Sequence, residues 1–205
     1  MKSSCLRPLA ALLLTVGLAA CGGKASYDVS GTISGLNNAG LVLANGGDTV
    51  SPAVGATAFT FPKRVDYGTD YNITVKTPPA HMNCSVSGGT GSAGRFVSIQ
   101  AFVSCQQNTY TVGGTITGQT VDGLVLGNGS TATPLTVAKA TATFVMPNPV
   151  ADGNSYGISV ITNPAGQTCT VATNPATGLS TGVGIMGEAK VETVRIVCVT
   201  NGTAS

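Results

Sequence analysis

Apolar residues alternate with polar residues over short stretches along most of the chain. One series places Tyr71, Ile73 and Val75 on one side of an extended segment, and a longer series runs from Val97 to Cys105. Alternation with a period of two is the pattern of a β-strand with one buried face. Segments rich in glycine, asparagine and aspartate, such as residues 45–48 and 88–91, separate these series and predict turns. The pattern therefore predicts a chain of short strands.

The whole pattern occurs twice. The following positions match: Tyr27 with Tyr110, Val29 with Val112, Gly31 with Gly114, Leu41 with Leu124, Phe61 with Phe144, Tyr71 with Tyr156, and Cys84 with Cys169. The separation between matched positions grows along the chain, which indicates insertions in loops. Each copy of roughly 85 residues has about seven predicted strands, the number typical of a β-sandwich. The sequence therefore predicts an all-β chain of two tandem antiparallel β-sandwich domains.

The N-terminal segment has the features of an export signal. Lys2 and Arg7 provide a basic start, and the apolar run from Leu9 to Ala20 is shorter than the roughly 20 residues that cross a bilayer. This combination is typical of a secretory signal peptide. The leader predicts that the chain is exported.

The leader ends in Leu18-Ala19-Ala20-Cys21, which resembles the lipobox of bacterial lipoproteins. The resemblance implies cleavage before Cys21, acylation of that cysteine, and an anchor in membrane lipid at the bacterial cell envelope, in the outer membrane if the cell has one. Two or three acyl chains, at about 0.8 kcal/mol per buried methylene, hold a protein durably. The alternative is an ordinary signal peptide with an incidental cysteine.

The leader and the repeat divide the chain into six segments. They are a signal peptide (1–20), a lipidated tether (21–26), a first sandwich (27–106), a linker (107–109), a second sandwich (110–200) and a C-terminal tail (201–205). The short tether places the first sandwich close to the lipid surface. The short linker allows little independent motion of the two sandwiches.

Two resemblances concern the fold. The series Phe59, Phe61, Gly68, Tyr71, Ile73 and Val75 resembles prealbumin-like and Cna-B-type sandwich repeats of bacterial surface proteins. The fuller string from Tyr27 to Cys105 resembles the tandem immunoglobulin-like repeats of proteobacterial lipoproteins and large secreted proteins. Both imply a sandwich, with either an immunoglobulin-like or a prealbumin-like strand order. Neither implies an activity, because sandwiches host many functions, and no lysine recurs between the copies to form the isopeptide bond of Cna-B-type domains.

The cysteines of an exported protein predict disulfides. Six are present, of which Cys5 lies in the leader and Cys21 is the lipidation site. The remaining four allow three pairings, and the repeat selects the one that matches in both copies: Cys84 with Cys105, and Cys169 with Cys198. This pairing places one disulfide in each domain. A redox or metal site is the alternative, but no C-x-x-C motif occurs and His81 is the only histidine.

Charge excludes one class of partner. The chain has 10 basic and 8 acidic residues, and two of the basic ones lie in the leader, so the mature protein has no net formal charge. Proteins that bind nucleic acid carry a basic face. We therefore expect no nucleic-acid partner.

The chain contains few residues that suggest catalysis. Residues 89–94 spell G-x-G-x-x-G but precede a predicted strand rather than a helix, so they offer no helix N-terminus to a phosphate. His81 follows two prolines in a loop and has no histidine counterpart in the second copy, and no G-x-S-x-G motif is present. Four acids near turns are expected to be solvated: Asp66, Asp70, Asp122 and Asp152. Paired glycosidase carboxylates are the alternative for this set, and a Ca²⁺ site is an alternative for Asp66 and Asp70. We expect no enzyme activity, no cofactor and no metal.

These observations favour a non-catalytic lipoprotein that acts as a binding, spacer or structural module at the cell envelope. Its expected partners are membrane lipid, through acylated Cys21, and an envelope protein or glycan. A carbohydrate-binding surface module is the alternative, with Tyr67, Phe96 and Phe102 as its aromatic platform, because the other four tyrosines fall on matched, inward positions. An envelope hydrolase that uses His81 is the second alternative.

Overall fold

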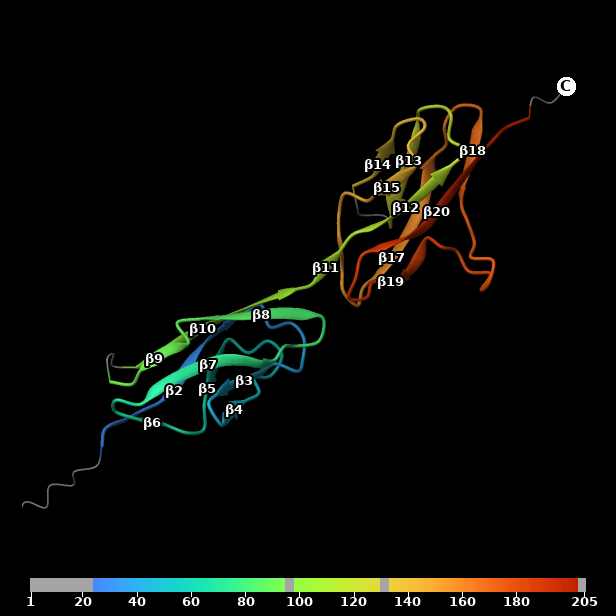
Figure 1. Ribbon diagram of the computed structural model, residues 1–205. Coiled ribbons are helices and arrows are strands. Elements are labelled where there is room, and N and C mark those ends of the chain that lie inside the picture. Colours follow the sequence, from blue (N-terminus) through green and yellow to red (C-terminus); the bar gives the residue numbers. More distant parts are fainter. Residues whose placement is uncertain (1–23, 95–97, 130–132, 203–205) are drawn as a thin grey trace, which may run out of the picture.

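The computed structural model describes residues 24–94, 98–129 and 133–202 (Figure 1). Every regular element in these residues is a β-strand, and the strands are numbered β1 to β20 along the chain. Within the same residues, no helix is long and apolar enough to cross a membrane. The prediction of an all-β chain is confirmed.

The first ten strands form one sandwich. Their bounds are β1 (Ser26–Tyr27), β2 (Val29–Ser34), β3 (Val42–Asn45), β4 (Asp48–Val50), β5 (Ala58–Thr60), β6 (Val65–Asp66), β7 (Asp70–Thr77), β8 (Met82–Ser87), β9 (Thr90–Ser92) and β10 (Ile99–Gln107). One four-stranded sheet has the order β5-β2-β10-β8 and the other has the order β4-β3-β7-β9, while β1 pairs with β6.

The last ten strands repeat this arrangement. Their bounds are β11 (Thr109–Tyr110), β12 (Val112–Thr117), β13 (Leu124–Asn128), β14 (Leu135–Val137), β15 (Thr143–Val145), β16 (Val150–Ala151), β17 (Ser155–Thr162), β18 (Gln167–Val171), β19 (Val183–Ile185) and β20 (Val191–Thr200). The sheet orders are β15-β12-β20-β18 and β14-β13-β17-β19, and β11 pairs with β16. The order of the strands is therefore the same in both copies.

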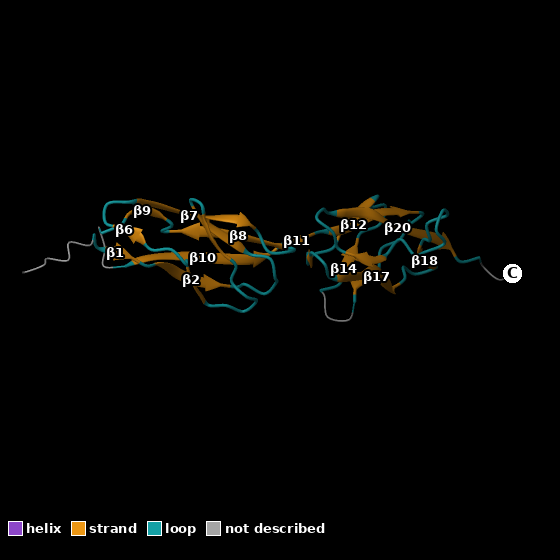
Figure 2. Cartoon of the chain, turned by 90° about the horizontal axis from the view of Figure 1, so that it is seen from below, coloured by secondary structure: helices purple, strands orange, loops and turns teal. Residues whose placement is uncertain are grey.

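The two sandwiches lie end to end, with β1 at one end of the molecule and β18 at the other (Figure 2). Each has its own hydrophobic core, which includes Val29, Leu43 and Val103 in the first sandwich and Val112 and Leu126 in the second. All five of these side chains are fully buried. The prediction of two tandem sandwiches is confirmed.

The burial of the strands follows their sequence pattern. In β10, Ile99, Ala101, Val103 and Cys105 are buried, whereas Gln100 and Phe102 between them are exposed. Each copy has ten strands among the described residues, more than the expected seven or so. The extra strands are short: β1 and β6 have two residues each, and several edge strands have three. Strands of two or three residues are too short to show an alternating pattern.

Most neighbouring strands are antiparallel, but each sandwich also contains one parallel pair. The parallel partner of β2 is β10, with Val29 opposite Ile99, and the parallel partner of β12 is β20, with Gly114 opposite Val194. These are the strands near the start and the end of each copy. They run in the same direction because the chain enters each sandwich at one end and leaves it at the other.

Each sandwich contains one disulfide between directly paired strands. Cys84 of β8 lies opposite Cys105 of β10, and Cys169 of β18 lies opposite Cys198 of β20. Disulfides join both pairs, which are 21 and 29 residues apart in the sequence. Because all four cysteines are buried, the two bonds form part of the cores.

Matched glycines lie where the parallel strands approach closely. A Cβ atom built on Gly114 would overlap the carbonyl group of Val194, and one built on Gly31 would overlap the carbonyl oxygen of Ala101. The nearest obstructing atom is a backbone atom in both cases, so it cannot turn away as a side chain could. The glycine that recurs in the repeat is therefore required by the packing of β2 on β10 and of β12 on β20.

Candidate functional site

The structure describes two of the three residues predicted to form an aromatic platform. Tyr67 is 63% exposed, lies in the turn between β6 and β7, and contacts Gly94 with its ring. Phe102 is 45% exposed and lies on the outer face of β10, between Thr32 of β2 and Ser87 of β8. Phe96 lies outside the described residues. Tyr67 and Phe102 belong to different elements, and ligand binding by the predicted aromatic platform stays a prediction.

A polar arrangement outside the sheets lies where the two sandwiches meet. His81, in the hairpin between β7 and β8, donates from Nδ1 to Oδ1 of Asp152, in the turn between β16 and β17, over 3.0 Å. The Asp152 side chain is only 1% exposed, whereas that of His81 is 48% exposed. The other carboxylate oxygen of Asp152 has no hydrogen-bond partner among the described residues. His81 is therefore the polar contact of this buried carboxylate.

Residues of the linker tie this contact to both sandwiches. The backbone N–H of Asn108 donates to the carbonyl of His81 (3.0 Å), and the backbone N–H of Asp152 donates to the carbonyl of Asn108 (2.9 Å). The Gln107 side chain donates to the carbonyl of Asp152 (2.9 Å) and accepts a bond from the amide of Asn38 (3.2 Å). We call these five residues, together with the bonds between them, the interdomain joint.

The backbone of His81 has a conformation that residues other than glycine seldom adopt. His81 has a φ of 61°, in the left-handed region where glycine is strongly favoured. The matched position in the second copy is Gly166, with a φ of 71°. The second copy thus has the residue that suits the turn, while the first has a strained residue whose side chain reaches the next sandwich. Strain of this kind persists where surrounding contacts compensate for it.

One expectation about these residues is wrong: Asp152, expected to be a solvated turn acid, is buried. His81 lies in a loop, as expected, and its exposed side chain contacts Asp152 of the second sandwich. The periodicity of each copy could not reveal this contact, because it forms only where one copy meets the next. The signal in the sequence was the difference between the copies: histidine in place of Gly166, and aspartate in place of Tyr67.

The other candidate chemistry is not assembled in the described part of the chain. The G-x-G-x-x-G stretch forms β9 and the turn after it, and the next element among the described residues is the strand β10, not a helix that could bind a phosphate. Asp66 and Asp70 are exposed. No group of three or more histidine, cysteine, aspartate or glutamate side chains in these ranges could hold a metal ion. Cys21, the predicted lipidation site, lies outside the described residues.

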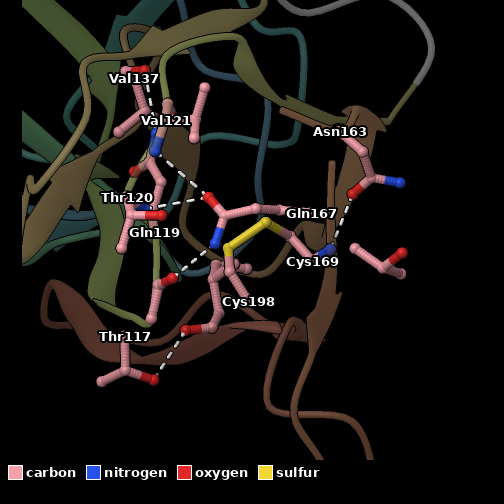
Figure 3. The surroundings of a disulfide bond; sticks show 12 residues. Thr117, Gln119, Thr120, Val121, Val137, Asn163, Gln167, Cys169 and Cys198 are labelled. Carbon is pink, nitrogen blue, oxygen red and sulfur yellow. Dashed lines mark hydrogen bonds between the residues drawn. A yellow bond between two sulfur atoms is a disulfide. The ribbon is translucent and has the colours of Figure 1, made fainter. Parts of the chain in front are cut away.

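A second buried polar cluster lies beside a disulfide of the second sandwich (Figure 3). The Gln167 side chain accepts bonds from the N–H groups of Thr120 and Val121 and donates to the carbonyl of Gly118, at 2.8 to 3.2 Å. Gln119 donates to the carbonyl of Val137. In the first copy, the matched positions are the buried apolar residues Leu36 and Met82. Since the bonds of Gln167 run to the backbone of one loop, this cluster holds the loop after β12 in place.

The comparisons with known proteins find distant likenesses to solved structures and nothing else. No protein-family model matches the chain, and no curated protein matches it. Among solved structures, the chain is similar to the major pilin protein T3.2 of Streptococcus pyogenes, with 10% identity and a TM-score of 0.29 over 87% of this chain and 98% of the pilin. It is also similar to the major pilin protein T-13 of the same species, with 11% identity and a TM-score of 0.26 over 87% of this chain and 97% of the pilin. At these TM-scores, neither likeness carries an argument about function.

Proposed function

We propose that this protein is a non-catalytic module of the bacterial cell envelope, in which two sandwiches form one rigid spacer held to membrane lipid through Cys21. The observation that carries the proposal is the interdomain joint. A flexible tether would not need a buried carboxylate or a strained histidine between its domains. Because both occur where the sandwiches meet, the joint favours a fixed relative orientation.

The energetics of Asp152 support the same conclusion. A carboxylate that is removed from water is costly unless a charged or hydrogen-bonding partner compensates for the lost solvation. Here the side-chain partner is His81, which belongs to the other sandwich. If the sandwiches separated, Asp152 would lose this partner. Separation is therefore disfavoured beyond the loss of the backbone hydrogen bonds alone.

The joint can be tested with His81→Gly. Glycine suits the left-handed backbone of this turn, as Gly166 shows at the matched position, so the substitution removes the imidazole without straining the hairpin. We expect the two cores to keep their stability while the range of interdomain orientations widens. Spin labels on the two sandwiches should give a broader distribution of distances than in the wild-type protein, measured by pulsed electron paramagnetic resonance.

The matched control for this experiment is Asp70→Asn. Asp70 is an exposed acid at the start of β7 and makes no ion pair with the described residues. This variant should leave the distance distribution as narrow as that of the wild-type protein. An unchanged distribution in His81→Gly would show that the imidazole does not fix the orientation.

The anchor can be tested separately with Cys21→Ser. Serine has no sulfur and cannot form the thioether that a cysteine thiolate forms, so the protein should either leave the membrane fraction or accumulate as an uncleaved precursor. Fractionation and intact-mass measurement distinguish these two results, and both support the anchor. Cys5→Ser, in the leader, is the control and should leave lipidation unchanged. A cleaved, membrane-bound Cys21→Ser protein would rule out lipid attachment at Cys21.

A further inference from the structure

The second sandwich contains a hairpin that the first lacks. In the first copy, β8 and β9 are joined by a short turn at residues 88 and 89, whereas in the second copy residues 172–182 lie between β18 and β19. This segment accounts for the longer separation of the second cysteine pair. It forms the orange loop that follows β18 in Figure 1. The hairpin is therefore an addition to a fold that is complete without it.

Hydrogen bonds give the hairpin a defined structure. Thr173 and Ser180 form a β-bridge, and the N–H of Asn174 donates to the carbonyl of Leu179 over 2.7 Å. The hydroxyl of Thr181 donates to the carbonyl of Ala172 over 2.9 Å and accepts from the N–H of Arg195 over 3.0 Å. The last of these bonds attaches the hairpin to β20.

The hairpin borders an open pocket that presents hydrogen-bond donors. A hollow of about 390 Å³ lies between the hairpin, β19 and β20, which is within the range of roughly 300 to 1,000 Å³ typical of small-ligand sites. Three side chains that line it already accept bonds from backbone N–H groups of the hairpin through their oxygens: Asn174, Thr177 and Ser180. Their N–H and O–H groups remain as donors. The pocket thus suits a ligand rich in acceptor oxygens.

Arg195 adds a positive charge to the same pocket. Its side chain lines the hollow, and it forms no ion pair with any residue that the structure describes. None of the described residues that line the pocket is acidic. A guanidinium group presents five N–H donors in a planar arrangement that matches a carboxylate. Arg195 is therefore placed to bind an anionic group.

The pocket also has an apolar side. Leu179 and Val183 line it and are 69% and 57% exposed, respectively. A ligand that combines a carboxylate, several acceptor oxygens and a C–H face would use all three parts of the pocket. A pyranose ring that carries a carboxylate has this combination of groups.

Comparison of the two copies supports a specific role for Arg195. Arg195 lies opposite Thr115 in the parallel pair of the second sandwich, and Phe102 lies opposite the matched residue Thr32 in the first. Arg195 and Phe102 therefore occupy the same position on the same face of the fold. The first copy has an aromatic ring and no hairpin there, so the charge and the hairpin occur together in the second copy alone.

We propose that the pocket between residues 172–182 and Arg195 binds an acidic saccharide, with the guanidinium group of Arg195 on the sugar carboxylate. The side chains of Asn174, Thr177 and Ser180 donate to the hydroxyl and ring oxygens of the sugar. Leu179 and Val183 contact its C–H face. This site lies on the second sandwich and does not depend on the lipid anchor or on the interdomain joint.

The test is a titration of the mature chain, in nonionic detergent, with tetramers of galacturonic, glucuronic and mannuronic acid. The methyl ester of each tetramer serves as the neutral control, and the readout is isothermal titration calorimetry with amide chemical shifts. We expect at least one acid tetramer to bind at least tenfold more tightly than its ester and to shift the amide signals of residues 174–183. Its affinity should fall as salt is added, because exposed charges are screened.

Variants separate the pocket from nonspecific attraction. Arg195→Gln should weaken binding of the acid tetramer at least tenfold, and Arg195→Lys, which keeps the charge but not the planar group, should bind with intermediate affinity. Arg64→Gln, in the first sandwich, is the matched control and should bind as the wild-type protein does. The proposal is wrong if no acid tetramer binds, if the esters bind equally well, if Arg195→Gln has no effect, or if a peptide with a free terminal carboxylate binds as tightly.

Discussion

Gly114→Ala should unfold the second sandwich or lower its free energy of unfolding by about 3 kcal/mol or more. A Cβ atom at this position would overlap the carbonyl group of Val194, so the two central strands β12 and β20 would have to move apart. These strands carry much of the core of the second sandwich, including the fully buried Val112 and Val194. Amide hydrogen exchange should show loss of protection throughout residues 110–200 and intact protection in the first sandwich.

Gly157→Ala is the matched control for this substitution. Gly157 also lies in a strand of the second sandwich, but a Cβ atom there would meet nothing within 4 Å. Since glycine in a strand loses more conformational freedom on folding than alanine does, this variant should be as stable as the wild-type protein or slightly more stable. Equal stability of Gly114→Ala and the wild-type protein would mean that β12 and β20 are not packed as closely as described above.

Replacing both cysteines of the first disulfide, Cys84→Ala with Cys105→Ala, should lower the stability of the first sandwich by about 2 to 5 kcal/mol, the usual range for a small exported domain. In the loop-entropy model, the bond restricts the unfolded chain between its two cysteines. The second sandwich should lose far less, because its own disulfide and core remain. Because the chain contains no tryptophan, denaturation is best followed by amide exchange, which resolves the two sandwiches.

The converse variant, Cys169→Ala with Cys198→Ala, provides the control. It should destabilise the second sandwich and leave most of the stability of the first. If either double substitution lowered the stability of both sandwiches equally, the two would unfold as one cooperative unit. The joint would then couple the stability of the two cores as well as their orientation.

The repeat and the alternation of apolar residues were enough to predict the two sandwiches and one disulfide in each. Core residues alternate with exposed ones through most of β7 and β10, which have eight and nine residues, so the pattern there is long enough to be unambiguous. The close approach of Gly114 to Val194 could not be predicted from the sequence in the same way. A recurring glycine is visible in the sequence, but the strand that approaches it is not.

The interdomain joint could not be predicted from either copy alone. In the first sandwich, the turn that corresponds to Asp152 carries Tyr67, which is exposed. Whether a residue at this position is buried depends on whether another sandwich lies directly before it in the chain. The tandem arrangement decides this, and the local sequence does not. The pocket at Arg195 was missed for a related reason. Its donors come from a hairpin whose sequence resembles an ordinary polar loop.

The parallel pairing of β2 with β10, and of β12 with β20, determines how the molecule would respond to tension. If the chain is pulled from its two ends, the paired strands are drawn in opposite directions along their own axes. The hydrogen bonds between them are then loaded in shear and must break together, whereas bonds pulled from one end of a hairpin break one after another. Once β2 separates, the disulfide between Cys84 and Cys105 still prevents the intervening loop from extending. Each sandwich therefore combines a strong first barrier to extension with a limit on how far it can lengthen.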